Sequence, residues 1–117
     1  AMMHFFNGKF EHLKRRTVIF ASHYDEPPGA ALLGTRIALT AAEYLAFERE
    51  MHVNVVLADM ANYIYSLQEI ENNQNPVCLT SDLASIYQRC GVMSGRNGSI
   101  TQIPALGVFR TPHPHAD

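Results

Sequence analysis

The stretch VNVVLADMANYIYSLQEI, residues 53–70, indicates a strand that passes directly into a helix. Aliphatic side chains fill four of the five positions from Val53 to Leu57, which is typical of a buried strand. Apolar side chains then recur at helical spacing and are predicted to point inward: Tyr63, Ile64, Leu67 and Ile70. A single acid, Asp59, stands between the two patterns. A strand that leads into an amphipathic helix is the unit from which α/β folds are built.

The rest of the chain switches repeatedly between strand-like and helix-like periods, which favours α/β units throughout. Further helices are predicted over residues 3–15, 32–51 and about 80–90, and further strands over residues 17–21 and 99–103. The predicted apolar face of the helix over residues 32–51 consists of Ile37, Ala38, Ala41, Ala42, Tyr44 and Leu45. Three parallel strands joined by right-handed crossovers are the expected result, in a single domain that covers residues 1–117.

Prolines and glycines set the expected boundaries of these elements. Residues 27–29, Pro-Pro-Gly, are predicted to form a loop, and Pro76 is predicted to stop the helix before it. Thr80 or Ser81 is then expected to cap the helix predicted over about residues 80–90, with Asp82 in its first turn. Gly91 suits the left-handed position that would end this helix. From about residue 107 the tail is predicted to be irregular.

Composition excludes several classes of protein. The chain has 117 residues and a net charge of -2, so it has no general attraction to nucleic acid. It contains no uninterrupted apolar run of about 18 residues, so no direct membrane insertion is expected. Its two cysteines, Cys78 and Cys90, are expected to be buried reduced thiols rather than a disulfide.

Asp59 is the principal candidate site residue, and two interpretations of it stay open. An acid at the carboxyl end of a buried strand can hold Mg²⁺ through water beside a nucleotide phosphate. The same acid can instead cap the following helix by accepting its first free backbone N–H groups. The phosphate interpretation calls for a glycine-rich G-x-x-x-x-G-K-[ST] loop, which the sequence does not contain.

The other titratable residues are weaker candidates. Asp25 and Glu26 are adjacent carboxylates in a loop, and adjacent side chains usually point apart into solvent. His113 and His115 in the tail could bind a cation, although no histidine or cysteine spacing matches a zinc site. No catalytic residue is therefore predicted.

Several segments together resemble the B subunits of V-type and archaeal A-type rotary ATPases. The segments are TRIALTAAEYLAFE (35–48), HVNVVLADM (52–60), SDLASIYQR (81–89) and, most specifically, GRNGSITQIPAL (95–106). FFNGKFE (5–11) fits the segment that precedes them in that family, and DEPPGA (25–30) is closer to the F-type β subunit. The order and spacing hold over roughly residues 5–106.

The resemblance implies an incomplete RecA-like α/β domain with a parallel sheet and flanking helices. It implies a non-catalytic, cytoplasmic subunit that works beside a catalytic A-type subunit in an ion-translocating ATPase, peripheral to the membrane. By motif match, Asp59 is the Walker-B-type aspartate, which would hold Mg²⁺ through water only when Mg-ATP or Mg-ADP binds. Tyr63 stands where the F-type catalytic subunit has an arginine.

The chain departs from the family where the phosphates would be held. The phosphate-loop region and the arginine-bearing segment near the nucleotide lie outside it, so little or no ATPase activity is expected of this chain alone. Two alternatives remain. One is an interaction module that associates with itself or with a partner through the same fold, and the other is a small flavodoxin-like enzyme.

Overall fold

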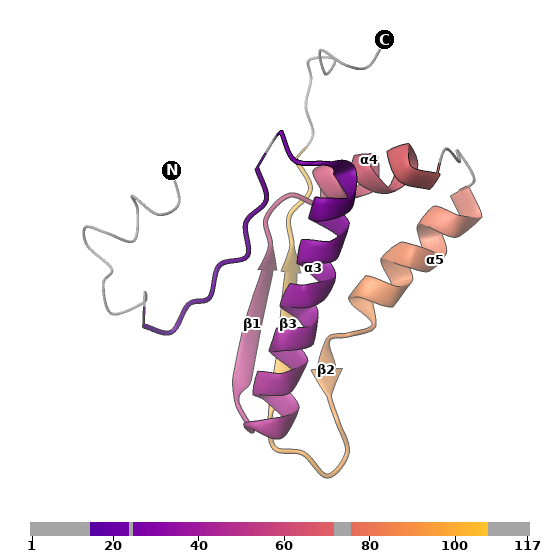
Figure 1. Ribbon diagram of the computed structural model, residues 1–117. Coiled ribbons are helices and arrows are strands. Elements are labelled where there is room, and N and C mark those ends of the chain that lie inside the picture. Colours follow the sequence, from indigo (N-terminus) through magenta and orange to yellow (C-terminus); the bar gives the residue numbers. More distant parts are fainter. Residues whose placement is uncertain (1–14, 24, 72–75, 108–117) are drawn as a thin grey trace.

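A computed structural model describes residues 15–23, 25–71 and 76–107, whose elements run in the order helix, π-helical turn, strand, two helices and two strands. The helices pack against a narrow sheet (Figure 1). The helix predicted over residues 3–15 falls almost wholly outside these ranges, as does the histidine-bearing tail. The fold class is therefore α/β, as the alternation of periods predicted.

The sheet contains strands β1 (His52–Leu57), β2 (Gly91–Val92) and β3 (Ser99–Pro104), in the order β1-β3-β2. β1 and β3 are parallel, with Val55 opposite Gln102, whereas β2 is antiparallel to β3. The prediction of three parallel strands is thus wrong, and the sheet is mixed. The short β2 is antiparallel because the turn at residues 93–98 folds the chain directly back into β3.

The strand predicted over residues 17–21 is not formed. Val18, Ile19 and Phe20 are 70%, 40% and 45% exposed, and the segment has no regular structure. Its β-branched and apolar residues favour an extended chain, but strand propensity mainly expresses how well a side chain fits a packed sheet surface. No described strand pairs with this segment, and its propensity alone does not produce a strand.

The long helix α3 (Pro28–Glu43) continues into a π-helical turn, η1 (Tyr44–Glu48). The prediction that Pro28 lies in a loop is wrong, because the fixed φ of proline suits the first turn of a helix, where no N–H partner is needed. The combined 21-residue helix is long and apolar enough to cross a membrane by length and composition, a test that core helices of soluble proteins also pass. Here its inner side packs against the sheet through Leu39 and Ala46, which are fully buried.

Helices α4 (Met60–Glu71) and α5 (Pro76–Tyr87) lie between β1 and β2 in the sequence. α4 has the predicted bounds, although Ile70 is 51% exposed rather than inward. α5 begins at Pro76, so the predicted cap at Thr80 or Ser81 is wrong and Asp82 lies in the middle of the helix. As at α3, a proline stands at the first position of the helix.

The end of α5 also differs from the prediction. Helix α5 ends at Tyr87, so Cys90 lies outside the helix and does not belong to its apolar side. Cys90 is exposed, and its thiol donates to the carbonyl of Tyr87 over 3.0 Å. Gly91 does have a positive φ of 129°, which favours glycine, but it lies beyond the end of α5 and begins β2 instead of ending the helix. The expectation of a buried thiol at Cys90 is therefore wrong.

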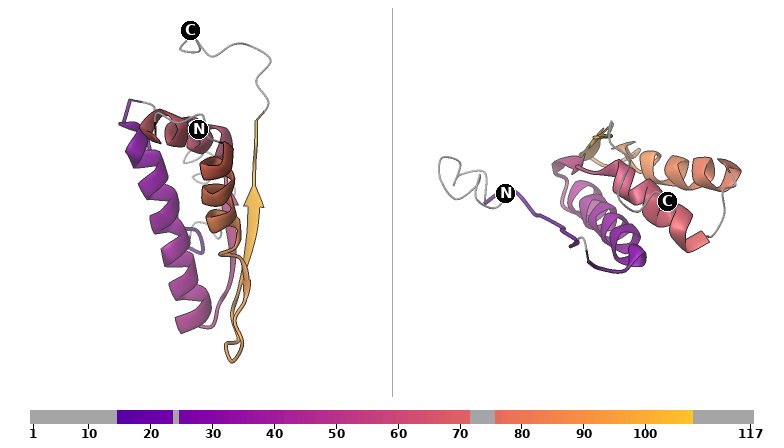
Figure 2. Two further views of the ribbon diagram at one scale, coloured as in Figure 1. Left: turned by 90° about the vertical axis from the view of Figure 1, so that its right-hand side faces the viewer. Right: turned by 90° about the horizontal axis from the view of Figure 1, so that it is seen from above.

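All described helices lie on one face of the sheet (Figure 2). Between them and the sheet lies one apolar core, formed by Leu39, Ala42, Ala46, Val55, Leu57, Met60, Tyr63, Ile86 and Ile100. The opposite face carries Val56 and Ile103, which are 62% and 53% exposed. β1 therefore alternates between buried and exposed side chains, instead of being covered on both sides as its aliphatic run predicted.

Candidate functional site at the carboxyl ends of the parallel strands

Asp59 lies two residues beyond the end of β1 and directly before α4. Because β1 and β3 are parallel and Leu57 is opposite Pro104, the chain leaves both strands at the same edge of the sheet. Figure 1 shows α3 and α4 beginning at this same end. The edge thus combines an exposed acid with two helix N-termini, whose partial positive charge favours anions.

The side chain of Asp59 caps α4. Its Oδ1 accepts a hydrogen bond from the backbone N–H of Asn62 over 3.0 Å, and its carbonyl accepts from the N–H of Tyr63 over 3.4 Å. This is the geometry of an N-cap residue that satisfies a donor in the first turn. The capping interpretation of Asp59 is therefore confirmed, while its role toward Mg²⁺ stays a prediction.

Backbone hydrogen bonds fix this loop to the segment that follows β3. The N–H of Ala105 donates to the carbonyl of Leu57 over 2.8 Å, and the carbonyl of Ala105 accepts from the N–H of Met60 over 3.1 Å. One bond is made by the residue before Ala58 and the other by the residue after Asp59. The carboxylate is thus held at a defined place on the sheet edge by main-chain atoms.

The edge offers little to hold a metal ion by itself. Within residues 15–23, 25–71 and 76–107, no group of three or more histidines, cysteines or carboxylates could serve as ligands. Asp25 and Glu26 precede α3 and are exposed. Mg²⁺ takes near-octahedral oxygen coordination and commonly combines one or two carboxylates with water and phosphate oxygens. Asp59 fits that donor set only as one ligand among several, with the remainder supplied by a nucleotide and by water.

A second polar cluster, which no pattern in the sequence indicated, connects the three helices. Asp82 on α5 accepts a hydrogen bond from the hydroxyl of Tyr63 on α4 over 2.6 Å and forms an ion pair with Arg36 on α3. Tyr63 is only 2% exposed, and the Asp82 side chain is 13% exposed. Tyr63 therefore serves to anchor α5. No sequence spacing signals a contact between residues on three separate helices.

Burial, together with the hydrogen bond to Asp82, raises the pKa of Tyr63 to about 12 from its ordinary value of 10.0. The neutral phenol is thus favoured in the folded protein relative to the unfolded chain. The stabilisation is fully present below pH 10 and is lost as the pH rises toward 12. We expect the free energy of unfolding to fall over this window, and to fall less in Tyr63→Phe. Urea unfolding of both proteins at pH 8, 10 and 11.5 measures the free energy of unfolding. An equal fall of this free energy with pH in the two proteins would contradict the prediction.

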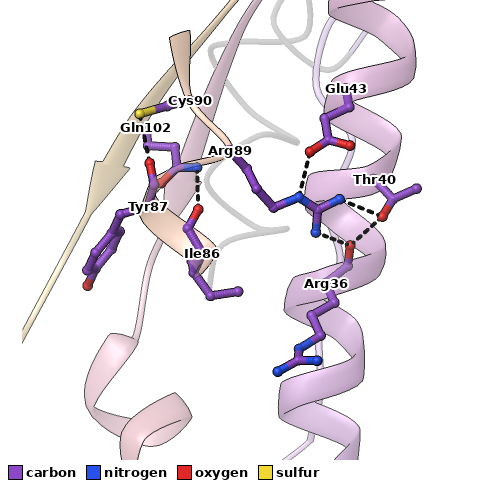
Figure 3. Close-up of polar contacts among 8 residues, drawn as sticks. All are labelled: Arg36, Thr40, Glu43, Ile86, Tyr87, Arg89, Cys90 and Gln102. Atoms are coloured by element: carbon purple, nitrogen blue, oxygen red, sulfur yellow. Dashed lines mark hydrogen bonds and ion pairs between the residues drawn. The ribbon is translucent and has the colours of Figure 1, made fainter. Parts of the chain in front are cut away.

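Arg89, just beyond the end of α5, joins the same helix to α3 (Figure 3). Its Nε donates to Glu43 over 2.5 Å and its Nη2 donates to the hydroxyl of Thr40 over 2.9 Å. The bond to Glu43 raises the pKa of the Arg89 guanidinium above its ordinary value. On the sheet side, the Nε2 of Gln102 donates to the carbonyl of Ile86 over 3.0 Å. Polar contacts thus position the end of α5 against both α3 and β3.

Comparison with known proteins identifies the family. The model of the ATP synthase alpha/beta family, nucleotide-binding domain, matches residues 2–111. The B subunit of the V-type proton ATPase of Plasmodium falciparum is 45% identical over 108 residues, which cover 86% of this chain and 21% of that protein. The B subunit of the A-type ATP synthase of Aeropyrum pernix is 48% identical over 99 residues, covering 78% of this chain and 21% of that protein.

A solved structure supports the same relationship. The unique ATP synthase subunit NeqB from Nanoarcheaum equitans superimposes with a TM-score of 0.74 at 39% identity, over 90% of this chain and 29% of that one. The chain spans about a fifth to a quarter of the length of the curated relatives that it matches. The strand β1, the acid after it and the parallel β3 all fall inside the matched region. This chain belongs to the ATP synthase alpha/beta family, and its relatives are B subunits of V-type and A-type ATP synthases.

Proposed function

We propose that this chain acts as a non-catalytic, B-subunit-like part of the nucleotide-binding domain of a V/A-type rotary ATPase, with a RecA-like architecture. The observation that carries the proposal is the place of Asp59, at the carboxyl end of β1 beside a parallel β3. In open α/β sheets, ligands bind at the carboxyl ends of the strands. The family match, which is to a nucleotide-binding domain, supports a role in such a domain.

The chain holds only one side of such a site. Asp59 would orient the water shell of Mg²⁺, but the sequence contains no glycine-rich loop with lysine to surround the phosphates. Each missing charge-assisted hydrogen bond is worth about 1.5–3 kcal/mol, so most of the affinity for a triphosphate is absent. Weak binding of Mg-nucleotide and no hydrolysis by this chain alone follow from that deficit.

The proposed partner is a catalytic A-type subunit of the same complex. The relatives are named as subunits of ATP synthases and a proton ATPase, so association with other subunits follows from the family. The complex would be peripheral to the membrane, on its cytoplasmic side.

Titration calorimetry with Mg-ADP and Mg-ATP, combined with a phosphate-release assay, tests the proposal. We expect weak saturable binding and no steady phosphate release. Asp59→Asn is expected to abolish the binding, because asparagine keeps the cap on α4 but removes the negative charge. Asp59→Ala is the matched variant that loses the cap as well, at a cost of about 1 kcal/mol in unfolding free energy. Sustained turnover by the wild-type chain, or binding unchanged in Asp59→Asn, would refute the proposal.

A further inference from the structure

Tyr63 belongs both to the capped start of α4 and to the polar cluster that connects the three helices. Its backbone N–H donates to the carbonyl of Asp59 over 3.4 Å, and its hydroxyl donates to Oδ2 of Asp82 over 2.6 Å. Tyr63 is 2% exposed, so its ring is closely packed and has little freedom to rotate. A displacement of Asp82 is therefore transmitted to the first turn of α4, where Asp59 lies.

The carboxylate of Asp82 is bound on both of its oxygens. Oδ2 accepts the hydrogen bond from Tyr63 on α4, and Oδ1 pairs with Arg36 on α3. In the view from above in Figure 2, α4 lies between α3 and α5. Because each oxygen has its own partner, Asp82 fixes α5 relative to both helices that begin at the sheet edge of Asp59.

The end of α5 is held by different residues. Arg89 donates to Glu43 on α3. Gln102 on β3 donates to the carbonyl of Ile86, which is 1% exposed. Ile86 and Arg89 lie about one and two turns beyond Asp82 along the chain. A rotation of α5 about this fixed end therefore displaces Asp82 while the contacts of Arg89 are kept.

The hydrogen bond between Tyr63 and Asp82 is an element with two distinct states. With α5 in place, the buried hydroxyl has its acceptor, and with α5 rotated away it has none. A buried hydroxyl without a partner is costly, so the packing around it changes between discrete arrangements instead of deforming gradually. Such a two-state element can couple two sites when both of them bias its equilibrium.

We propose that Asp82 is a positioning residue for Asp59, so that α5 regulates the nucleotide edge of the sheet through Tyr63. The inference rests on the proposed function of Asp59, because it assigns a regulator to that site. Oδ1 of Asp59 accepts from the N–H of Asn62, so the first turn of α4 determines where Oδ2 points. With α5 in place, Tyr63 holds this turn in its capped geometry. Reciprocity then requires that Mg-nucleotide at Asp59 also favours the bound position of α5.

Amide hydrogen exchange of the nucleotide-free chain, followed by NMR, tests the coupling. The reporters are the N–H groups of Asn62 and Tyr63, which both donate to Asp59. The amides of β1 and β3 report the change in global stability. In Asp82→Ala we expect the reporters to exchange about 10-fold faster, beyond any change that the strand amides share. Arg89→Ala is the matched control, because it loosens α5 from α3 without removing the acceptor of Tyr63.

Two further variants identify the route of the coupling. Asp82→Asn keeps an oxygen that can accept from the Tyr63 hydroxyl, so the reporters should again exchange slowly. In a Tyr63→Phe background the hydroxyl is already absent, so Asp82→Ala should add no further increase. A rise shared equally by reporters and strand amides in Asp82→Ala would overturn the proposal. So would an equal effect of Arg89→Ala on the reporters, or an undiminished effect of Asp82→Ala in the Tyr63→Phe background.

Titration with Mg-ADP connects this positioning to the nucleotide site. Asp82→Ala should weaken the binding of Mg-ADP by about 5-fold or more, whereas Arg89→Ala should leave the dissociation constant unchanged. Equal affinity in the wild type and Asp82→Ala would overturn the regulation while leaving Asp59 as a nucleotide site. A wild-type chain that does not bind Mg-ADP would refute the proposed function, and the exchange experiment would still decide whether Asp82 positions Asp59.

Discussion

Gly98→Ala is expected to be the most destabilising single change among the described glycines. A Cβ at this position would lie 1.7 Å from the carbonyl oxygen of Ala46 and 2.7 Å from that of Met51. Both obstacles are backbone atoms, one in η1 and the other just before β1, so no side-chain rotation can relieve the overlap. The turn before β3 would have to move away from the helix. We expect the free energy of unfolding, measured by urea titration, to fall by about 3 kcal/mol or more.

Gly34→Ala is the matched control for that prediction. It makes the same chemical change inside α3, where nothing lies within 4 Å of the added methyl group. Alanine in a helix interior is favoured over glycine by about 0.5–1 kcal/mol, so this variant should be slightly more stable than the wild type. If both variants lost similar stability, the close approach at Gly98 would not be the cause.

Asp82→Ala is expected to cost about 3 kcal/mol in unfolding free energy. The change removes the acceptor of the Tyr63 hydroxyl, which is almost fully buried, and leaves that donor without a partner. It also removes the ion pair with Arg36, so α5 loses its polar connections to α3 and α4 at this point. Urea unfolding of the two proteins at pH 7 measures the loss.

Two further variants separate the components of this cluster. Arg36→Ala should cost less than about 1 kcal/mol, because the Arg36 side chain is 51% exposed and exposed ion pairs contribute little. Tyr63→Phe in the Asp82→Ala background should recover part of the lost stability, because it removes the unpaired hydroxyl. An Asp82→Ala loss no greater than that of Arg36→Ala would show that the buried hydrogen bond is not what holds α5.

The sequence predicted the strand–acid–helix unit at residues 52–71 well, because each of its signals is local. The aliphatic run of β1, the capping acid and the period of α4 act on neighbouring residues, and all three appear in the structure. Asp59 was thereby placed at the correct edge of the sheet. The local signals could not identify which groups would hold a ligand together with Asp59, because such groups come from distant parts of the sequence.

The errors have three physical causes. A loop is predicted at Pro28 because proline breaks regular structure, whereas proline is equally suited to the first turn of a new helix, as Pro76 also shows. A strand was predicted at residues 17–21 from composition, although a strand exists only where another strand completes its hydrogen bonds. The cluster of Arg36, Tyr63 and Asp82 was missed because its members meet only when three helices pack together.

The main-chain hydrogen bonds of Ala105 hold the loop of Asp59 in place, so the position of Asp59 does not depend on the side chain at residue 105. One residue offers its amide to the end of β1 and its carbonyl to the start of α4. Any amino acid except proline can provide both groups, so a substitution at this position need not displace the acid. Substitutions around the sheet edge would then change its charge and shape, while the backbone hydrogen bonds that position Asp59 stay the same.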